Sequence, residues 1–144
     1  MPKALRVLVL GSGFAGQGHA EAFRNAGVEI IGMVSRTLSV TQQVAKEMNI
    51  PYATTDWKTA LTQLQPDIVA IGTPGGVHVD PIMTALEQNC HIYSDKPLAA
   101  TAKEAKMLYL KAHEKGTKTA YAASMRYLPY ALLAKSLIAE GKIG

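Results

Sequence analysis

The chain has 144 residues, which is close to the length of one domain, and its single cysteine, Cys90, excludes an internal disulfide. Hydrophobic residues make up 48% of the chain and charged residues 18%, which is the composition of a globular protein that buries a core. The net charge of +4 is spread without a basic run, which argues against a nucleic-acid partner, and no apolar run suits a signal peptide or membrane span, so we expect a cytoplasmic protein.

Apolar runs alternate with helical patterns along the chain, which is typical of βαβ units around a parallel sheet. Six strands are predicted, at residues 5–10, 28–34, 52–53, 67–72, 91–94 and 117–123. Helices are predicted between and after them, at residues 17–26, 39–48, 56–64, 79–86, 101–115 and 129–140. This succession predicts an α/β domain with a doubly wound parallel sheet in the order 3-2-1-4-5-6. In such a sheet, ligands bind outside the carboxyl ends of the strands, where the strand order reverses.

Two helix starts carry the pattern of a capping box, in which two side chains three residues apart bond each other's backbone N–H. Ser39 with Gln42 is the first pair, and Thr101 with Glu104 is the second. If Ser39 is the cap, one face of its helix is formed by Val40, Val44 and Met48.

The first strand runs into the sequence Gly11-Ser12-Gly13-Phe14-Ala15-Gly16, which opens the first helix. A G-x-G-x-x-G turn between a strand and a helix predicts the dinucleotide site of a Rossmann fold. Gly11 lets the chain turn, Gly13 lets a pyrophosphate approach the backbone, and Gly16 lets the helix pack closely on the strand. The free N–H groups and positive dipole end of the helix would face the phosphates. The alternative is a tight βα turn that binds no ligand.

The second strand ends in Ser35-Arg36, and no acidic residue stands at its tip. An NAD site usually has Asp or Glu there, to hold the ribose 2′-hydroxyl. A serine hydroxyl and a guanidinium would instead donate hydrogen bonds to a 2′-phosphate. The tip therefore favours NADP(H), with NAD(H) as the alternative cofactor. An exposed arginine without a ligand would leave the same pattern.

Lys96 lies at the end of the predicted strand 91–94 and is followed by Pro97. A lysine at this edge can reach a carbinol oxygen beside a nicotinamide, where it would relay a proton or polarise a carbonyl. The alternative is a lysine that only caps a surface loop. No residues are assigned to a metal site.

Four further stretches accompany the glycine turn and its His19-Ala20 extension. They are Thr73-Pro74-Gly75-Gly76-Val77-His78, Asp95-Lys96-Pro97-Leu98-Ala99, Arg126 with Pro129, and Gly141-Lys142-Ile143-Gly144. In this order and spacing, the five stretches resemble the amino-terminal half of the Gfo/Idh/MocA oxidoreductases, named for glucose-fructose oxidoreductase and inositol dehydrogenase. The resemblance covers essentially the whole chain.

The resemblance implies roles for several residues. Thr73, Pro74 and His78 would line the nicotinamide side of the site, and Lys96 would be the catalytic lysine near the reacting carbon. The family's glutamate that contacts cofactor ribose hydroxyls is replaced by Asp95, which puts that contact in doubt. The remaining residues that the resemblance assigns to cofactor binding are Pro97 and Arg126. The resemblance also favours a cis Lys96–Pro97 bond, which would turn Lys96 toward the nicotinamide, and Ser124 stands where Asn is common.

Members of the family continue into a second α/β domain, which supplies most of the sugar pocket, a proton-transferring histidine and the usual dimer surface. The resemblance therefore implies that residues 1–144 are an isolated NAD(P)-binding domain without this substrate domain. We expect the parent protein to be an NAD(P)-dependent oxidoreductase acting on a sugar, polyol or similar small alcohol. Two alternatives remain: a non-catalytic dinucleotide sensor or regulatory module, and a relative of the NAD-dependent glycosidases.

The chain alone is expected to bind cofactor without turning over substrate. The walls that would hold the substrate carbon against the nicotinamide belong to the second domain, and such positioning can supply about 7–11 kcal/mol. Apolar surface is expected to be exposed near Leu133 and Leu137, where that domain would dock, and self-association into a homo-oligomer is a consequence to test.

Overall fold

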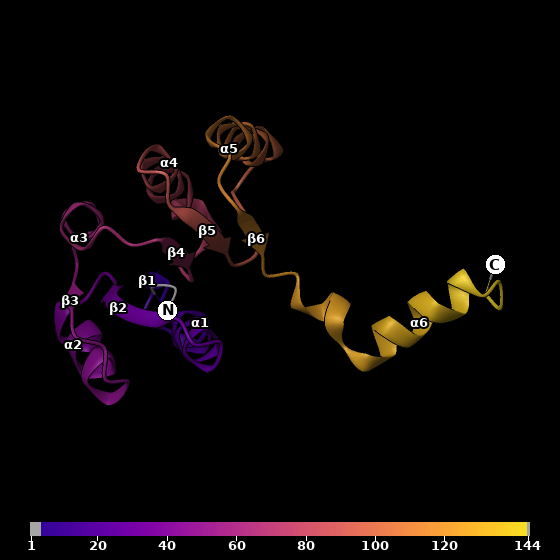
Figure 1. Ribbon diagram of the computed structural model, residues 1–144, viewed down its shortest axis with the longest axis horizontal. Helices are drawn as coiled ribbons and strands as arrows, with labels where there is room; N and C mark the ends of the chain where they lie inside the picture. Colours follow the sequence, from indigo (N-terminus) through magenta and orange to yellow (C-terminus); the bar gives the residue numbers. More distant parts are fainter. Residues whose placement is uncertain (1–3, 144) are drawn as a thin grey trace.

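Six parallel strands form one sheet, in the order β3-β2-β1-β4-β5-β6, in the computed structural model, which describes residues 4–143 (Figure 1). The strands are β1 (Arg6–Leu10), β2 (Glu29–Val34), β3 (Ala53–Thr54), β4 (Ile68–Ile71), β5 (His91–Ser94) and β6 (Thr119–Tyr121). The fold class and the strand order are those predicted from the alternation of apolar runs and helical patterns. The last strand is shorter than the predicted run 117–123.

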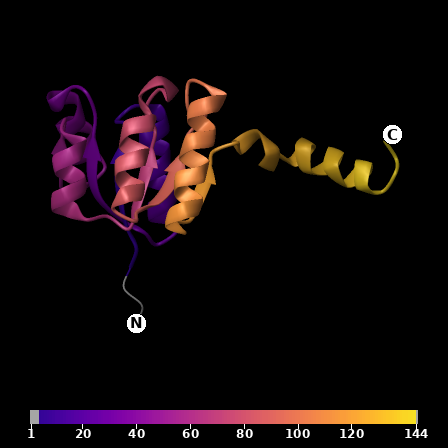
Figure 2. The same ribbon diagram turned by 90° about the horizontal axis from the view of Figure 1, so that it is seen from above.

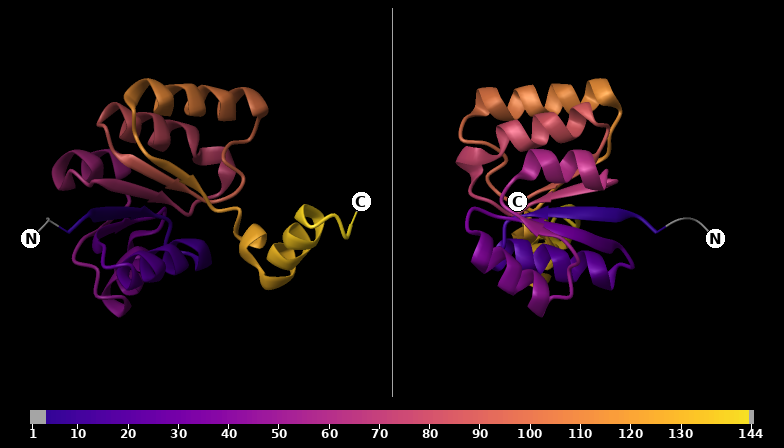
Figure 3. Two further views of the ribbon diagram at one scale, coloured as in Figure 1. Left: turned by 45° about the vertical axis from the view of Figure 1, so that its right-hand side comes forward. Right: turned by 90° about the vertical axis from the view of Figure 1, so that its left-hand side faces the viewer.

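Helices cover both faces of the sheet, as Figure 3 shows. The helices are α1 (Phe14–Asn25), α2 (Leu38–Glu47), α3 (Trp57–Leu64), α4 (Val79–Glu87), α5 (Ala102–Lys115) and α6 (Pro129–Ala139), with short 3-10 turns η1 (Gly75–Val77) and η2 (Ser124–Tyr127). α1 and α2 lie on one face, and α3, α4 and α5 lie on the other (Figure 3). Within residues 4–143, no helix has the length and apolar character needed to cross a bilayer.

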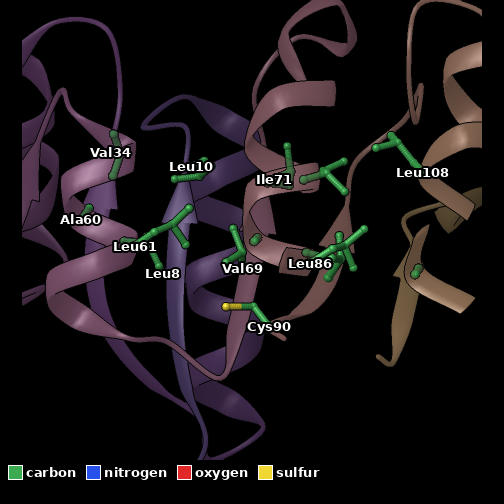
Figure 4. Packing of buried hydrophobic residues seen from close by; sticks show 14 of the residues in the cluster. Leu8, Leu10, Val34, Ala60, Leu61, Val69, Ile71, Leu86, Cys90 and Leu108 are labelled. Carbon is green, nitrogen blue, oxygen red and sulfur yellow. The ribbon is translucent and has the colours of Figure 1, made fainter. Parts of the chain in front are cut away.

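The core consists of two layers because the central strands bury side chains on both faces. Leu8 of β1 and Val69 of β4 belong to the layer under α3, α4 and α5, much of which is visible in Figure 4. Val7 of β1 and Ala70 of β4 belong to the layer under α1 and α2. All four side chains are fully buried. Alternating residues of one strand therefore hold the two helix layers together.

α5 begins with the predicted capping box. The Glu104 N–H donates to Thr101 Oγ1 at 3.2 Å, and the Thr101 N–H donates to Glu104 Oε2 at 2.9 Å. Both orphan N–H groups at the start of the helix are thereby satisfied.

α2 starts earlier than predicted. Its N-cap is Thr37, not Ser39, because the N–H and the hydroxyl of Thr41 both donate to the Thr37 carbonyl, at 2.9 and 2.8 Å. Val40, expected on the inward face, is 48% exposed. The inward face is formed by Thr41, Val44 and Ala45.

The carboxyl-terminal segment leaves the sheet after β6. α6 extends away from the helices that cover the sheet, as Figures 1 and 2 show. None of its residues is buried, and Leu133 is 59% exposed, while Leu137 is half-buried. The apolar surface expected around these two leucines is therefore present in the structure.

Candidate functional site

The carboxyl ends of four neighbouring strands lie side by side. Leu10 at the end of β1 pairs with Val34 of β2 and with Ile71 of β4, and Ile71 pairs with Ser94 of β5. The loops after these strands therefore start at one edge of the sheet. They contain the glycine turn, Ser35-Arg36, the Thr73–His78 stretch and Asp95–Pro97, so the structure brings together most of the predicted site residues.

The glycine turn is closed by backbone contacts that leave no room for side chains. Gly11 has a φ of 117°, and a Cβ added to it would lie 2.7 Å from the Gly72 carbonyl oxygen. A Cβ added to Gly16 would lie 1.9 Å from the Gly11 oxygen. A Cβ added to Gly72, at the end of β4, would lie 2.7 Å from the Gly16 nitrogen. The start of α1 is therefore fixed against the ends of β1 and β4.

Gly13 differs from these three glycines because a Cβ added to it would meet no atom within 4 Å. It is the N-cap of α1, and no side chain caps this end of the helix. The first N–H groups of α1 are consequently free to bind an anion, which the helix dipole also favours. The Phe14 side chain is 97% exposed and Ala15 is half-buried, so neither covers the glycine backbone with a packed side chain.

A chain of hydroxyl groups links the glycine turn to the tip of β2. The Ser12 hydroxyl donates to Ser35 Oγ at 2.8 Å, Ser35 Oγ bonds Thr41 Oγ1, and the Thr41 hydroxyl donates to the Thr37 carbonyl. Each hydroxyl has one proton, and the Thr41 proton goes to Thr37, so Ser35 must donate to Thr41. Ser35 then has only a lone pair left for a ligand. Donation from Ser35 to a 2′-phosphate is not what this ligand-free arrangement offers and stays a prediction, whereas Arg36 is exposed and remains a donor.

On the other side of the glycine turn, Asp95 and Lys96 follow β5. Asp95 Oδ1 accepts a hydrogen bond from the Lys96 N–H at 2.7 Å, and the Lys96 side chain is exposed. The Lys96–Pro97 peptide bond is cis, as predicted. The other carboxylate oxygen, Asp95 Oδ2, lies 3.9 Å from Nε2 of His19 on α1.

His19 also lies at this edge, although it was noted in the sequence only as part of a motif. Its ring contacts the Tyr93 ring edge to face, with centroids 4.9 Å apart. Burial lowers the pKa of His19, although the Asp95 carboxylate acts in the opposite direction. The ring is therefore neutral at physiological pH, and its contact with Asp95 is too long for a hydrogen bond.

Two buried side-chain atoms at this edge have no hydrogen-bond partner, and they are the only ones among residues 4–143. They are His19 Nε2 and Thr73 Oγ1. Buried polar atoms are normally satisfied, so unpartnered ones need an explanation such as a ligand or an unseen water. Together with the open backbone at Gly13, they fit a polar ligand that lies along this edge.

The predicted residues of the β4 loop are placed differently from one another. Pro74 is exposed and Thr73 is half-buried. His78 is fully buried, and both of its ring nitrogens contact backbone oxygens. The structure thus places Thr73 and Pro74 at the surface of the edge and His78 beneath it.

Arg126 is the predicted residue that the structure does not bring to the edge. It lies on η2, beyond β6, and its guanidinium is 5.5 Å from the centre of the Tyr127 ring. η2 is set apart from the glycine turn in Figure 1. A role of Arg126 in cofactor binding stays a prediction.

A cavity lies at the opposite edge, where β4 and β5 begin. It has about 550 Å³, and its lining includes Asp67, Cys90 and His91. Burial, with a smaller contribution from Asp67, raises the pKa of the Cys90 thiol to about 11. The thiol is therefore protonated at neutral pH and unreactive. None of the predicted site residues lines this cavity, which is an open groove rather than a site of chemistry.

Comparison with known proteins agrees with this geometry. The family model GFO_IDH_MocA, described as "Oxidoreductase family, NAD-binding Rossmann fold", matches residues 5–123. A levoglucosan dehydrogenase of Pseudarthrobacter phenanthrenivorans is 29% identical over 97% of this chain and 38% of its own length. A scyllo-inositol 2-dehydrogenase (NAD(+)) of Bacillus subtilis is 30% identical over 100% of this chain and 43% of its own length.

Solved structures show the same similarity. The crystal structure of an NAD binding oxidoreductase from Klebsiella pneumoniae has a TM-score of 0.86 and 31% identity, covering 99% of this chain and 40% of that protein. The chain thus spans about two-fifths of the length of the relatives that it matches.

Proposed function

This chain belongs to the Gfo/Idh/MocA oxidoreductase family, and we propose that it is the cofactor-binding part of an NAD(P)-dependent oxidoreductase acting on a sugar, polyol or similar small alcohol. One observation carries the proposal. Gly11, Gly16 and Gly72 fix the start of α1 by close backbone contacts, while Gly13 and the first N–H groups of the helix stay open. This is the arrangement that a pyrophosphate needs.

The strand order supports a placement for the two halves of a dinucleotide. With the pyrophosphate at Gly13, the adenosine half extends over the tip of β2, where Ser35 accepts a ribose hydroxyl proton. The nicotinamide half extends over the ends of β4 and β5, toward Thr73 and Asp95. The unpartnered Thr73 Oγ1 and His19 Nε2 lie on this second side and support the assignment.

The nicotinamide, when bound, accepts or donates the hydride. The contribution of this chain is to orient the cofactor and to handle the proton of the alcohol. Lys96 is the residue that we assign to this proton, because its side chain is exposed at the end of β5, beside the nicotinamide half of the site. The relatives, a levoglucosan dehydrogenase and a scyllo-inositol 2-dehydrogenase, support a cyclic sugar or polyol as the substrate class.

We propose a preference for NADP(H) that rests on Arg36 alone. The Ser35 hydroxyl donates its proton to Thr41 Oγ1. No acidic residue directly follows β2, where it could bind a 2′-hydroxyl or repel a 2′-phosphate. Replacing Arg36→Ala should weaken NADPH binding by about 1.5–3 kcal/mol, the range for a hydrogen bond to a charged group, and leave NADH nearly unchanged. Fluorescence titration of the wild-type chain and of Arg36→Ala, each with NADPH and with NADH, measures this difference. An equal loss for the two cofactors would exclude recognition of the 2′-phosphate by Arg36.

Turnover is expected to require the substrate domain that family members carry beyond this region. The test pairs a cofactor titration with NADP⁺ and NAD⁺ reduction assays over a panel of sugars and polyols, using the 144-residue chain. We expect binding without reduction. Efficient reduction by this chain would show that the substrate groups are misassigned, and failure of the folded chain to bind any dinucleotide would overturn the proposed function.

A further inference from the structure

The His78 ring joins two loops of the candidate site from beneath. Its Nε2 lies 2.6 Å from the carbonyl oxygen of Thr73, in the loop after β4. Its Nδ1 lies 3.2 Å from the carbonyl oxygen of Leu98, in the loop after β5, and 3.4 Å from Ser94 Oγ. The ring itself has no exposed surface. His78 can therefore contact both loops at once, but it cannot contact a ligand at the surface.

The groups around the ring determine which of its nitrogens carries the proton. A carbonyl oxygen only accepts, so the 2.6 Å contact with Thr73 needs a proton on Nε2. A neutral imidazole carries one N–H, so Nδ1 then holds a lone pair, which faces the Ser94 hydroxyl at 3.4 Å, and its 3.2 Å approach to the Leu98 oxygen is a packing contact. An apolar side chain at position 78 would leave the part-buried Thr73 carbonyl oxygen without its partner, which is costly.

A second contact between the same loops is steric. A Cβ added to Gly75, in η1, would lie 2.5 Å from Pro97 Cγ and 3.0 Å from the Pro97 oxygen. The backbone of the β4 loop therefore rests directly on the proline ring of the β5 loop. Gly75 and His78 hold the two loops at a fixed separation from two sides.

We propose that His78 is a positioning residue, which sets the relative placement of Thr73 and Lys96 by donating a hydrogen bond to the β4 loop and packing against the β5 loop. The proposal rests on the assigned dinucleotide function, because it is the nicotinamide half of the cofactor that would lie over these two loops. The adenosine half lies over Ser35 and Arg36, which His78 does not touch. Loss of His78 should therefore affect one half of the ligand and spare the other.

The test compares two ligands that share the adenosine half. NADH spans both halves of the edge, whereas ADP reaches only the glycine turn and the tip of β2. In the 144-residue chain, His78→Leu should weaken NADH binding roughly tenfold, as expected for a part-buried carbonyl left unpaired, and change ADP binding by less than about twofold. Isothermal titration with each ligand gives both affinities.

A conservative variant separates the hydrogen bond from the bulk of the ring. A Gln side chain can place its amide N–H near the position of Nε2, toward Thr73. His78→Gln should recover part of the NADH affinity that His78→Leu loses. If it recovers none, the ring acts by filling space and the proposal is wrong.

Two glycine variants keep the test decisive if His78→Leu does not fold. Gly75→Ala forces the loops apart at Pro97 and should reproduce the selective loss of NADH affinity. Gly18→Ala, in α1, is the matched control because its Cβ would meet no atom within 4 Å, so both affinities should stay unchanged. Equal losses of NADH and ADP affinity in His78→Leu and Gly75→Ala would overturn the proposal.

Hydrogen exchange distinguishes a failure of this proposal from a failure of the assigned function. In His78→Leu without ligand, backbone amides of residues 73–78 and 96–98 should exchange faster, while those of residues 11–16 keep their rates. If the wild-type chain binds neither NADH nor ADP, the assigned function fails, and the exchange rates still decide whether His78 joins the loops. Unchanged exchange in both loops would overturn its positioning role.

Discussion

The first strand and the last helix are opposite extremes of burial in this molecule. Four of the five residues of β1 are buried, and helices cover both sides of that part of the sheet. α6 has eleven residues, none of them buried, although its composition is strongly apolar. Apolar composition therefore does not locate the core. We therefore expect the region around β1 to account for most of the free energy of unfolding and for the rigidity of the loops at the carboxyl ends of the strands. α6 should contribute little to either.

The largest expected loss of stability comes from inserting a side-chain atom into the backbone contact between α1 and the turn that follows β1. Gly16→Ala places a Cβ 1.9 Å from the Gly11 oxygen, where only backbone movement can relieve the clash. We expect a loss of about 3 kcal/mol or more in the free energy of unfolding, together with loss of dinucleotide binding. Urea denaturation measures the first and NADH titration the second.

The control for this change lies two residues further along α1. Gly18→Ala meets no atom within 4 Å and should stabilise the helix by about 0.5–1 kcal/mol through higher helix propensity. Equal stabilities of the two variants would mean that α1 does not approach the turn as closely as described.

A pair of leucine truncations compares the two regions directly. Leu61 of α3 is fully buried, so Leu61→Ala should destabilise the chain by about 2–5 kcal/mol. Leu133 of α6 is 59% exposed, so Leu133→Ala should change the free energy of unfolding by less than about 0.5 kcal/mol. Denaturation at several protein concentrations checks both values. A concentration-dependent loss in Leu133→Ala would instead reveal that α6 is covered by another copy in solution.

Removing a helix cap should lower the free energy of unfolding by less than these core substitutions do. Thr101 caps α5 with two reciprocal hydrogen bonds to Glu104, whereas α6 begins after Leu128 without any side-chain cap. Thr101→Ala should therefore cost about 1 kcal/mol of unfolding free energy. Thermal denaturation monitored by circular dichroism is the appropriate measurement, and Glu104→Gln, which keeps an acceptor for the Thr101 N–H, should retain most of the stability.

The smallest expected effect is the contribution of His19, on α1, to the pH dependence of the free energy of unfolding. Burial lowers the pKa of His19, so the unfolded chain binds more protons than the folded chain just below the ordinary value of 6.5. Stability due to this group is therefore complete above that pH and decreases as the pH falls through 6.5 toward the lowered folded value. His19→Gln should flatten the stability profile in this window, as urea denaturation at a series of pH values measures.

The sequence predicted what depends on local pattern. Alternating apolar runs were sufficient for the six strands and their order, and the Thr101–Glu104 pair was sufficient for the start of α5. The cap of α2 was misplaced because Thr37 and Ser39 have equally suitable side chains. The choice between them is made by Thr41, whose hydroxyl and N–H both reach the Thr37 carbonyl.

Contacts between loops that lie far apart in the chain could not be predicted from the sequence. Gly72 was not assigned to the site, because its role is the close approach of Gly16, which lies 56 residues earlier in the chain. His78 was expected to line the nicotinamide side; its ring is fully buried, with Nε2 2.6 Å from the Thr73 carbonyl oxygen, and its role toward a cofactor stays a prediction. His78 stands in a stretch that the sequence marked as part of the site, and Gly72 directly precedes that stretch. Their orientation follows only from how β4 and β5 bring their loops together.

The hydroxyl chain at the tip of β2 has a consequence for ionic strength. Since Ser35 offers a ligand a lone pair and no proton, discrimination between the two cofactors is assigned to a single exposed guanidinium charge on Arg36. The attraction between such a charge and a phosphate is screened by salt, over a Debye length of about 10 Å at 0.1 M and about 3 Å at 1 M. Acceptance of a neutral ribose hydroxyl by Ser35 is not screened in this way. The same edge would therefore be selective for NADPH in dilute buffer and nearly indifferent between the cofactors in concentrated salt.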